Sequence, residues 1–245
     1  MTPSSLGDGA VVVGVDGSQA ALNAVRWAAV EAAARDECLR LVHVVPAPGP
    51  ADRVLARAAR VATSSPHAVH VETATVVGTP GEELLRESRS ASMLCIGLRS
   101  ARGDEREVGP TVHALARGSA CPVAVIRTRA DGTAHTDGVI SVVLSDEADN
   151  DDVVHFAMHE GRLRRATVRQ VDQRVDSWVR RYPDVHVEIV AGETGRQYRW
   201  RDATAGVVGL AVVGRTDAQD FGSADAPDGH PILGYPDCSV LLVRS

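Results

Sequence analysis

The sequence predicts an α/β protein of two tandem, doubly wound domains, each built on a parallel five-stranded sheet. Three observations support this. Strand-length apolar runs alternate with Ala-rich helical patterns, the strand runs are continuously apolar, and segments of the first half recur in the second. Continuous Val, Ile and Leu runs suit parallel strands covered by helices on both faces. A chain of 245 residues has room for two domains of about 120 residues each.

The first half contains five strand-like runs separated by helical segments. Asp, Gly and Ser directly follow the first run, which is typical of a turn that leads into a helix. The predicted elements, in order, are a strand over 11–15, a helix over 20–35, a strand over 39–45, a helix over 51–63, a strand over 69–77, a helix over 81–88, a strand over 93–97, a helix that begins near Pro110 and a strand over 123–127.

An internal repeat links the two halves. The heptapeptide CPVAVIR recurs 117 residues later as CSVLLVR (positions 121 and 238), and VHVE recurs 116 residues later (positions 69 and 185). A period this long indicates duplicated domains and not a solenoid of short units. The polar stretch 128–137 is the natural linker, so we expect one domain over residues 1–132 and a second over residues 133–245.

Composition excludes several classes of protein. All 26 basic residues are Arg, and a chain without Lys cannot form a Walker A loop or a pyridoxal Schiff base. A net charge of -6 with 3% aromatic residues argues against nucleic-acid binding. No apolar run approaches the roughly 20 residues of a membrane span, and the N-terminal segment lacks a secretory pattern. We therefore expect a cytoplasmic protein with neither nucleic acid nor membrane as partner.

The sequence also gives no pattern for metal binding or catalysis. The four cysteines are far apart, without a CxxC pair, and no GxSxG elbow is present. We interpret the four cysteines (Cys38, Cys95, Cys121 and Cys238) as reduced core residues. We predict no metal site and no catalytic residues.

The candidate binding edge follows from the fold class. Ligands of doubly wound sheets bind beyond the carboxyl ends of the strands, at the topological switch point. Asp16 follows the first strand, and the fourth strand ends in a glycine-containing segment. Two interpretations of Asp16 remain open: a turn or helix cap, or a carboxylate that accepts hydrogen bonds from the base or ribose of a nucleotide.

The motifs VVVGVDGS, LVHVV, a glycine loop after the fourth strand and CPVAVIR together resemble the universal stress protein family in its tandem-domain form, over essentially the whole chain and more weakly in the second half. The resemblance implies an ATP site with a loop of pattern G-x2-G-x9-G-[ST]. By position, Asp16 would face the adenosine and Val44 would line the adenine pocket. Independently of the resemblance, Arg99 would add positive charge near the phosphates, although acids in the same loop oppose it. The candidate nucleotide-binding residues are Asp16, Gly17, Val44, Gly97, Arg99, Ser100, Gly109, Pro110 and Thr111.

The loop departs from the family pattern. Ser100 replaces the second glycine, the spacer that follows it has eight residues (101–108), and Pro110 follows Gly109. Pro110 has no amide hydrogen for a phosphate, although proline is also common at the first position of a helix. Two hypotheses follow. The protein is a non-enzymatic stress-response protein that binds ATP, with Mg²⁺, or another adenine nucleotide as a regulatory ligand; alternatively, it is a nucleotide-free dimerisation and interaction scaffold of the same fold.

The second half departs further. Five acids follow its first strand within 146–152, and its fourth strand leads into an acidic loop without the glycine motif. Residues 1–132 hold 14 acidic and 14 basic residues, whereas residues 133–245 hold 18 and 12, so the whole net charge belongs to the second half. We expect a degenerate copy and at most one nucleotide site per chain. The resemblance also implies that the two copies pair within the chain and can associate further as a homodimer; the protein partners are unknown.

Overall fold

The computed structural model describes residues 9–49, 52–99, 108–143, 150–172, 181–191, 207–214 and 238–244. The chain divides into two compact units, with the change between them after Ala134. Each unit contains a parallel five-stranded sheet, which confirms the predicted α/β class. Within the described ranges, no helix is long and apolar enough to cross a membrane.

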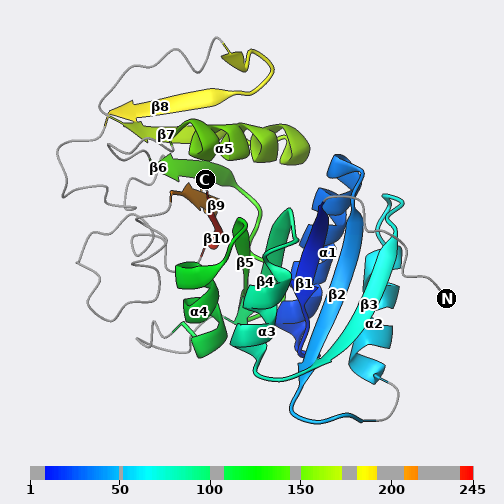
Figure 1. Cartoon of the computed structure of the whole chain (residues 1–245). Helices are drawn as coiled ribbons and strands as arrows, with labels where there is room; N and C mark the ends of the chain where they lie inside the picture. The colour runs from blue at the N-terminus through cyan, green and yellow to red at the C-terminus, as the bar shows by residue number, and fades with distance from the viewer. Residues whose placement is uncertain are drawn as a thin grey trace. The chain divides into compact units, whose positions relative to one another are not determined.

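The first unit has the strand order β3-β2-β1-β4-β5, and every neighbouring pair is parallel (Figure 1). The direction of winding reverses between β1 and β4, so the switch point lies between these strands. The elements are β1 (Ala10–Gly14), α1 (Gln19–Arg35), β2 (Cys38–Val45), α2 (Arg53–Thr63), β3 (Val71–Val77), α3 (Pro80–Glu87), β4 (Met93–Arg99), α4 (Pro110–Gly118) and β5 (Val123–Thr128).

Local sequence signals explain where the helices begin and end. The Ser18 side chain accepts a hydrogen bond from the Ala21 amide (3.1 Å) and caps α1. Asp52 caps α2 in the same way, and α3 and α4 each begin with a proline, whose fixed φ suits the first helical position. Asp36 ends α1 in the left-handed conformation (φ 55°), which Asp tolerates better than most residues.

Helices cover both faces of this sheet. Helices α1 and α2 contact each other, as do α3 and α4. Gly97 of β4 faces α1, because a Cβ placed on it would lie 2.1 Å from the carbonyl carbon of Ala20. A Cβ on Gly14 of β1 would instead meet Leu84 of α3. The fully buried strand residues between these layers include Leu39, Leu41, Leu94 and Ile126.

A buried asparagine connects α1 to the end of the sheet. The Asn23 amide nitrogen donates to the Thr128 hydroxyl (3.0 Å) and to the Gly132 carbonyl (3.0 Å). Its oxygen accepts from Arg26 (3.0 Å) and Gln19 (3.2 Å). The segment predicted as a linker therefore begins with a hydrogen-bonded turn that is fixed to the first unit.

Replacing this asparagine tests the connection. We expect Asn23→Ala to lower the free energy of unfolding by about 1–3 kcal/mol, because the half-buried Gly132 carbonyl and the buried Thr128 hydroxyl lose this donor. Urea unfolding followed by circular dichroism measures the change. Gln19→Ala is the control, since it leaves both bonds of the Asn23 nitrogen intact. Equal stability of the two variants would contradict the expected role of Asn23.

The second unit repeats the same strand order. Its sheet runs β8-β7-β6-β9-β10 with parallel neighbours, so β6 and β9 occupy the places that β1 and β4 hold in the first unit. Arg169 of β7 makes two hydrogen bonds to Glu188 of β8 (2.9 and 2.8 Å). The described elements are β6 (Val139–Val143), α5 (Asn150–Arg164), β7 (Val168–Asp172), β8 (Val187–Ala191), β9 (Val208–Val213) and β10 (Ser239–Leu242).

Candidate functional site

The registers of the first sheet bring several predicted site residues to one edge. Gly14, the last residue of β1, lies opposite Val42 of β2. Continued for two residues, the same register sets Asp16 level with Val44. The pairing of β1 with β4 sets Asp16 level with the residue after Gly97. Asp16, Val44 and the end of β4 therefore share the carboxyl edge of the sheet at its switch point.

Asp16 is exposed and forms the turn between β1 and α1. Its Oδ1 accepts a hydrogen bond from the Ser18 amide (2.9 Å), so the turn interpretation is confirmed. Oδ2 has no hydrogen-bond partner among the described residues and can accept from a ligand. Gly17 has a φ of 81°, and a Cβ there would lie 3.1 Å from Val54 at the start of α2. The Asp16–Gly17 turn therefore lies against the first turn of α2.

Val44 is half-buried and has a polar cluster beside it that the sequence did not point to. His43 Nδ1 lies 2.5 Å from Asp52 Oδ2, and the Thr75 hydroxyl donates to the same oxygen (3.1 Å). The other oxygen of Asp52 accepts from the Val54 and Leu55 amides (2.9 and 3.1 Å). One carboxylate thus caps α2 and fixes it to the carboxyl ends of β2 and β3.

The pKa of Asp52 shows the balance within this cluster. Partial burial raises it, but hydrogen bonds from His43, the Leu55 amide and Thr75 outweigh that effect, and the pKa falls below its usual value. The signal available in the sequence was the position of Asp52 within the first two residues of a helical pattern, where an N-cap is expected.

Gly97 has a structural role that does not involve a ligand. An added Cβ would lie 2.1 Å and 2.2 Å from the carbonyl carbon and oxygen of Ala20, and 2.5 Å from the Ala21 amide nitrogen. Only glycine therefore lets α1 pack this closely on β4. Arg99 is exposed at the end of β4, opposite Thr128 of β5. Ser100, with the loop positions 101–107, lies outside the described residues.

The start of α4 differs from the starts of α1 and α2. Gly109 is its N-cap (φ -60°, ψ 158°) and provides no side-chain cap, and Pro110 has no amide hydrogen. Like the first turns of α1 and α2, its first turn contains no acid. The first amide bonded within the helix is that of His113, which donates to the Gly109 carbonyl (3.1 Å). Among the described residues no side chain caps the amides of Thr111 and Val112, which leaves them available as a phosphate-binding helix requires.

The cysteines agree only partly with the prediction. Cys95, Cys121 and Cys238 are buried, and all four thiols are free of disulfides. Cys38 is not a core residue, because it is the first residue of β2, at the amino ends of the strands, and is only partly buried.

In the second unit, Asp151 and Asp152 are exposed in the first turn of α5. The preceding acids at 146–149 and the loop after β9 lie outside the described residues.

The strand order defines a doubly wound α/β protein. At the carboxyl ends of its strands lie the carboxylate of Asp16 and the start of α4, which has no side-chain cap. The universal stress protein family model matches residues 9–127. Universal stress protein Rv2624c of Mycobacterium tuberculosis is 34% identical over 261 aligned residues, which cover 96% of each chain. Rv3134c of the same organism is 34% identical over 275 aligned residues, again with 96% of each chain covered. The chain belongs to the universal stress protein family.

Solved structures agree with this fold. The crystal structure of a universal stress protein from Archaeoglobus fulgidus superposes with a TM-score of 0.66, covers 97% of this chain and 98% of its own, and is 14% identical. This structure supports the fold, whereas the family model and the mycobacterial relatives confirm the predicted family resemblance.

Proposed function

We propose that the first unit binds ATP, with Mg²⁺, or another adenine nucleotide at its carboxyl edge as a regulatory ligand. The uncapped, acid-free start of α4 is the observation that carries the proposal. Helix α3 also lacks a side-chain cap, but Glu82 and Glu83 occupy its first turn and would repel phosphate. Of the four described helix starts in this unit, that of α4 therefore suits an anion best.

Each proposed role uses a group that the fold leaves available. Asp16 Oδ2 accepts from ribose hydroxyls while Oδ1 closes the turn. The half-buried Val44 contacts the base. The amides of Thr111 and Val112 donate to phosphate oxygens, and the exposed Arg99 adds positive charge.

Binding, without turnover, is the proposed activity. The polar cluster near Val44 is already used for structure: Asp52 caps α2 and orients His43. We propose one nucleotide per chain, since the second half, as a degenerate copy, lacks the glycine motif and follows its first strand with acids.

A nucleotide-free interaction scaffold is the second candidate, and one observation favours it. The close contact of Gly97 with Ala20 explains this glycine without any ligand. Pro110, likewise, is explained as a helix start. Gly97 and Pro110, which occupy two positions of the family loop pattern, would then serve only helix packing and the helix start.

Asp16→Asn separates the two candidates. Asparagine keeps an acceptor for the Ser18 amide but removes the charge and turns one acceptor into a donor, so we expect nucleotide affinity to fall at least tenfold. The measurements are the nucleotide content of the purified protein after denaturation and calorimetric titration of the emptied protein with ATP, AMP and cyclic AMP. Asp36→Asn is the matched control, because Asp36 is exposed at the other end of α1 and Asn also tolerates the left-handed conformation.

Adenine nucleotide near one per chain, retained in Asp36→Asn and lost in Asp16→Asn, would support the regulatory-ligand proposal. An empty protein that binds none of the three nucleotides would favour the scaffold. Two nucleotides per chain would contradict the proposed single site, and steady release of phosphate from ATP would contradict binding without turnover.

A further inference from the structure

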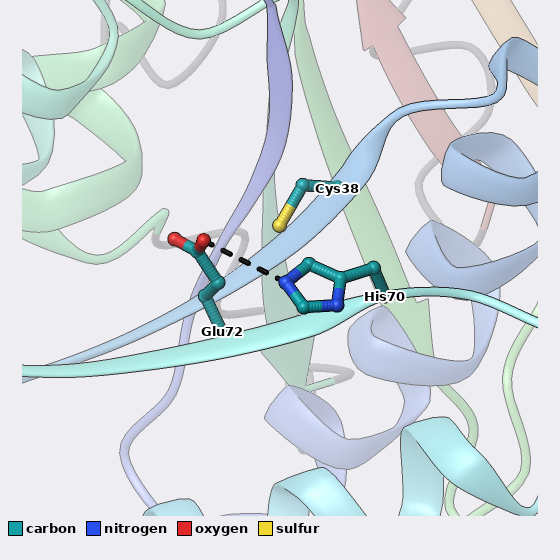
Figure 2. Close-up of side chains that lie close together, drawn as sticks. All are labelled: Cys38, His70 and Glu72. Carbon is teal, nitrogen blue, oxygen red and sulfur yellow. Dashed lines mark ion pairs between the residues drawn. The ribbon is translucent and has the colours of Figure 1, made fainter. Parts of the chain in front are cut away.

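Three side chains with different metal-binding chemistry come together at the amino edge of β2 and β3, opposite the proposed nucleotide edge. Leu39 pairs with Val71, so Cys38 lies beside His70 and close to Glu72. The Leu39 amide donates to the His70 carbonyl (2.8 Å) and fixes this register. Figure 2 shows the thiol, the imidazole and the carboxylate converging on one space.

The distances suit a small, tetrahedral metal ion. One ligand atom of each residue lies within 4.8 Å of the other two, and His70 Nε2 lies 3.7 Å from Glu72 Oε1. Ligand atoms on a tetrahedral zinc are about 3.3–3.6 Å apart, given metal–ligand bonds of about 2.0–2.3 Å. Because the His70 side chain is 75% exposed, a small rotation can close the remaining gap without disturbing the core.

The ion pairs of Arg40 leave one carboxylate oxygen of Glu72 available to a metal ion. Arg40 makes two hydrogen bonds to Glu87 (2.9 and 3.2 Å) and lies 3.8 Å from Glu72 Oε2. Glu72 Oε1 is the oxygen that faces His70. Arg40 is therefore held mainly by Glu87, and one oxygen of Glu72 is left for a cation.

Cys38 is the cysteine suited to a soft cation, because the other three are buried. Partial burial, together with the Glu72 carboxylate, raises the pKa of the Cys38 thiol above its usual value, against smaller opposing effects of the Glu72 amide and Arg40. A metal that binds sulfur replaces the thiol proton, which is released to solvent.

We propose that Cys38 Sγ, His70 Nε2 and Glu72 Oε1 bind one zinc ion, with a water molecule as the fourth ligand. Cysteine, histidine and glutamate are all common zinc ligands, and three protein ligands with one open position form a stable site. The ion would join the first residue of β2 to the start of β3. This site is independent of nucleotide binding, and neither proposal requires the other.

Metal titration of the full chain tests the proposal. The metal-free, reduced protein is titrated with ZnCl₂ in competition with a chromogenic chelator, and separately with CoCl₂ to record the thiolate-to-cobalt charge-transfer band. We expect one ion per chain and a cobalt band that Cys38→Ser abolishes. His70→Ala and Glu72→Gln should each weaken zinc binding at least tenfold.

His67→Ala is the matched control, because His67 is also exposed and lies three residues before His70. Its zinc affinity should equal that of the unchanged protein. Unfolding of each metal-free variant shows that it remains folded, and Cys38→Ser and His70→Ala do not touch the Arg40 ion pairs. Zinc binding that survives Cys38→Ser unchanged, or that His67→Ala weakens as much as His70→Ala, would overturn the proposal, as would the absence of stoichiometric binding.

Discussion

Gly97→Ala is expected to lower the free energy of unfolding by about 3 kcal/mol, at the upper end for an overpacked core. The added methyl would lie 2.1–2.5 Å from three backbone atoms of Ala20 and Ala21. Backbone atoms cannot turn aside as a flexible side chain does, so α1 would have to move away from β4. Urea unfolding monitored by circular dichroism measures the loss.

Gly109→Ala is the matched control for this prediction. A Cβ at Gly109 meets no atom within 4 Å, and its φ of -60° is ordinary for alanine. Its stability should fall by no more than about 1 kcal/mol, because alanine is a poorer N-cap than glycine but meets no neighbouring atom here. The two glycines belong to the same family loop pattern, so equal stability of Gly97→Ala and Gly109→Ala would mean that the packing argument for Gly97 is wrong.

Asp52→Ala should have the second largest effect on stability, a loss of about 2–3 kcal/mol. Removing an N-cap alone costs about 0.5–2 kcal/mol, and this substitution also removes the partner of His43 and Thr75. Asp52→Asn should be intermediate, because it keeps an acceptor for the Val54 and Leu55 amides. Thermal and urea unfolding of both variants measure the two contributions.

The stability that Asp52 contributes should depend on pH. Because the pKa of Asp52 is lower in the folded protein than in the unfolded chain, its contribution is fully present above the unfolded value of about 3.9. It is lost as the pH falls through the folded value. The difference between the original protein and Asp52→Ala should therefore be complete at pH 7 and shrink below about pH 4. A difference of constant size down to pH 2 would contradict the ionic part of the argument.

Much of the first unit could be predicted because its signals are local. The turn after the first strand, the helix start near Pro110 and the continuous apolar strands depend on neighbouring residues alone. Strand β3 begins at Val71, two residues later than predicted. The preceding His70 offers only its carbonyl to β2, and this pairing cannot be read from apolar content.

The repeat was visible only in part, because one connection between strands differs in length between the two units. The first strands of the two units begin 129 residues apart (Ala10 and Val139), whereas the third strands begin 116 apart (Val71 and Val187). The connection before the third strand is shorter in the second unit, where it spans residues 173–186 in place of 46–70. A comparison at one fixed offset therefore finds the later strands and misses the earlier ones.

The clusters of the site could not be predicted, because they depend on strand register. His43 meets Thr75, and Cys38 meets His70, each across a separation of 32 residues that includes a whole helix. No spacing motif encodes such a pair. The interpretation of Cys38 as a core residue was wrong for the same reason: its exposure depends on where β2 begins relative to β3.

Strand β2 connects the two proposed sites, with Val44 near its carboxyl end and Cys38 at its amino end. At about 3.3 Å per residue, the six steps between these residues span about 20 Å. That length exceeds the screening distance of about 8 Å at physiological ionic strength. The charge of a zinc ion bound at the amino end of the strand would therefore hardly affect phosphates bound at its carboxyl end, and the strand would separate two electrostatic environments within one small unit.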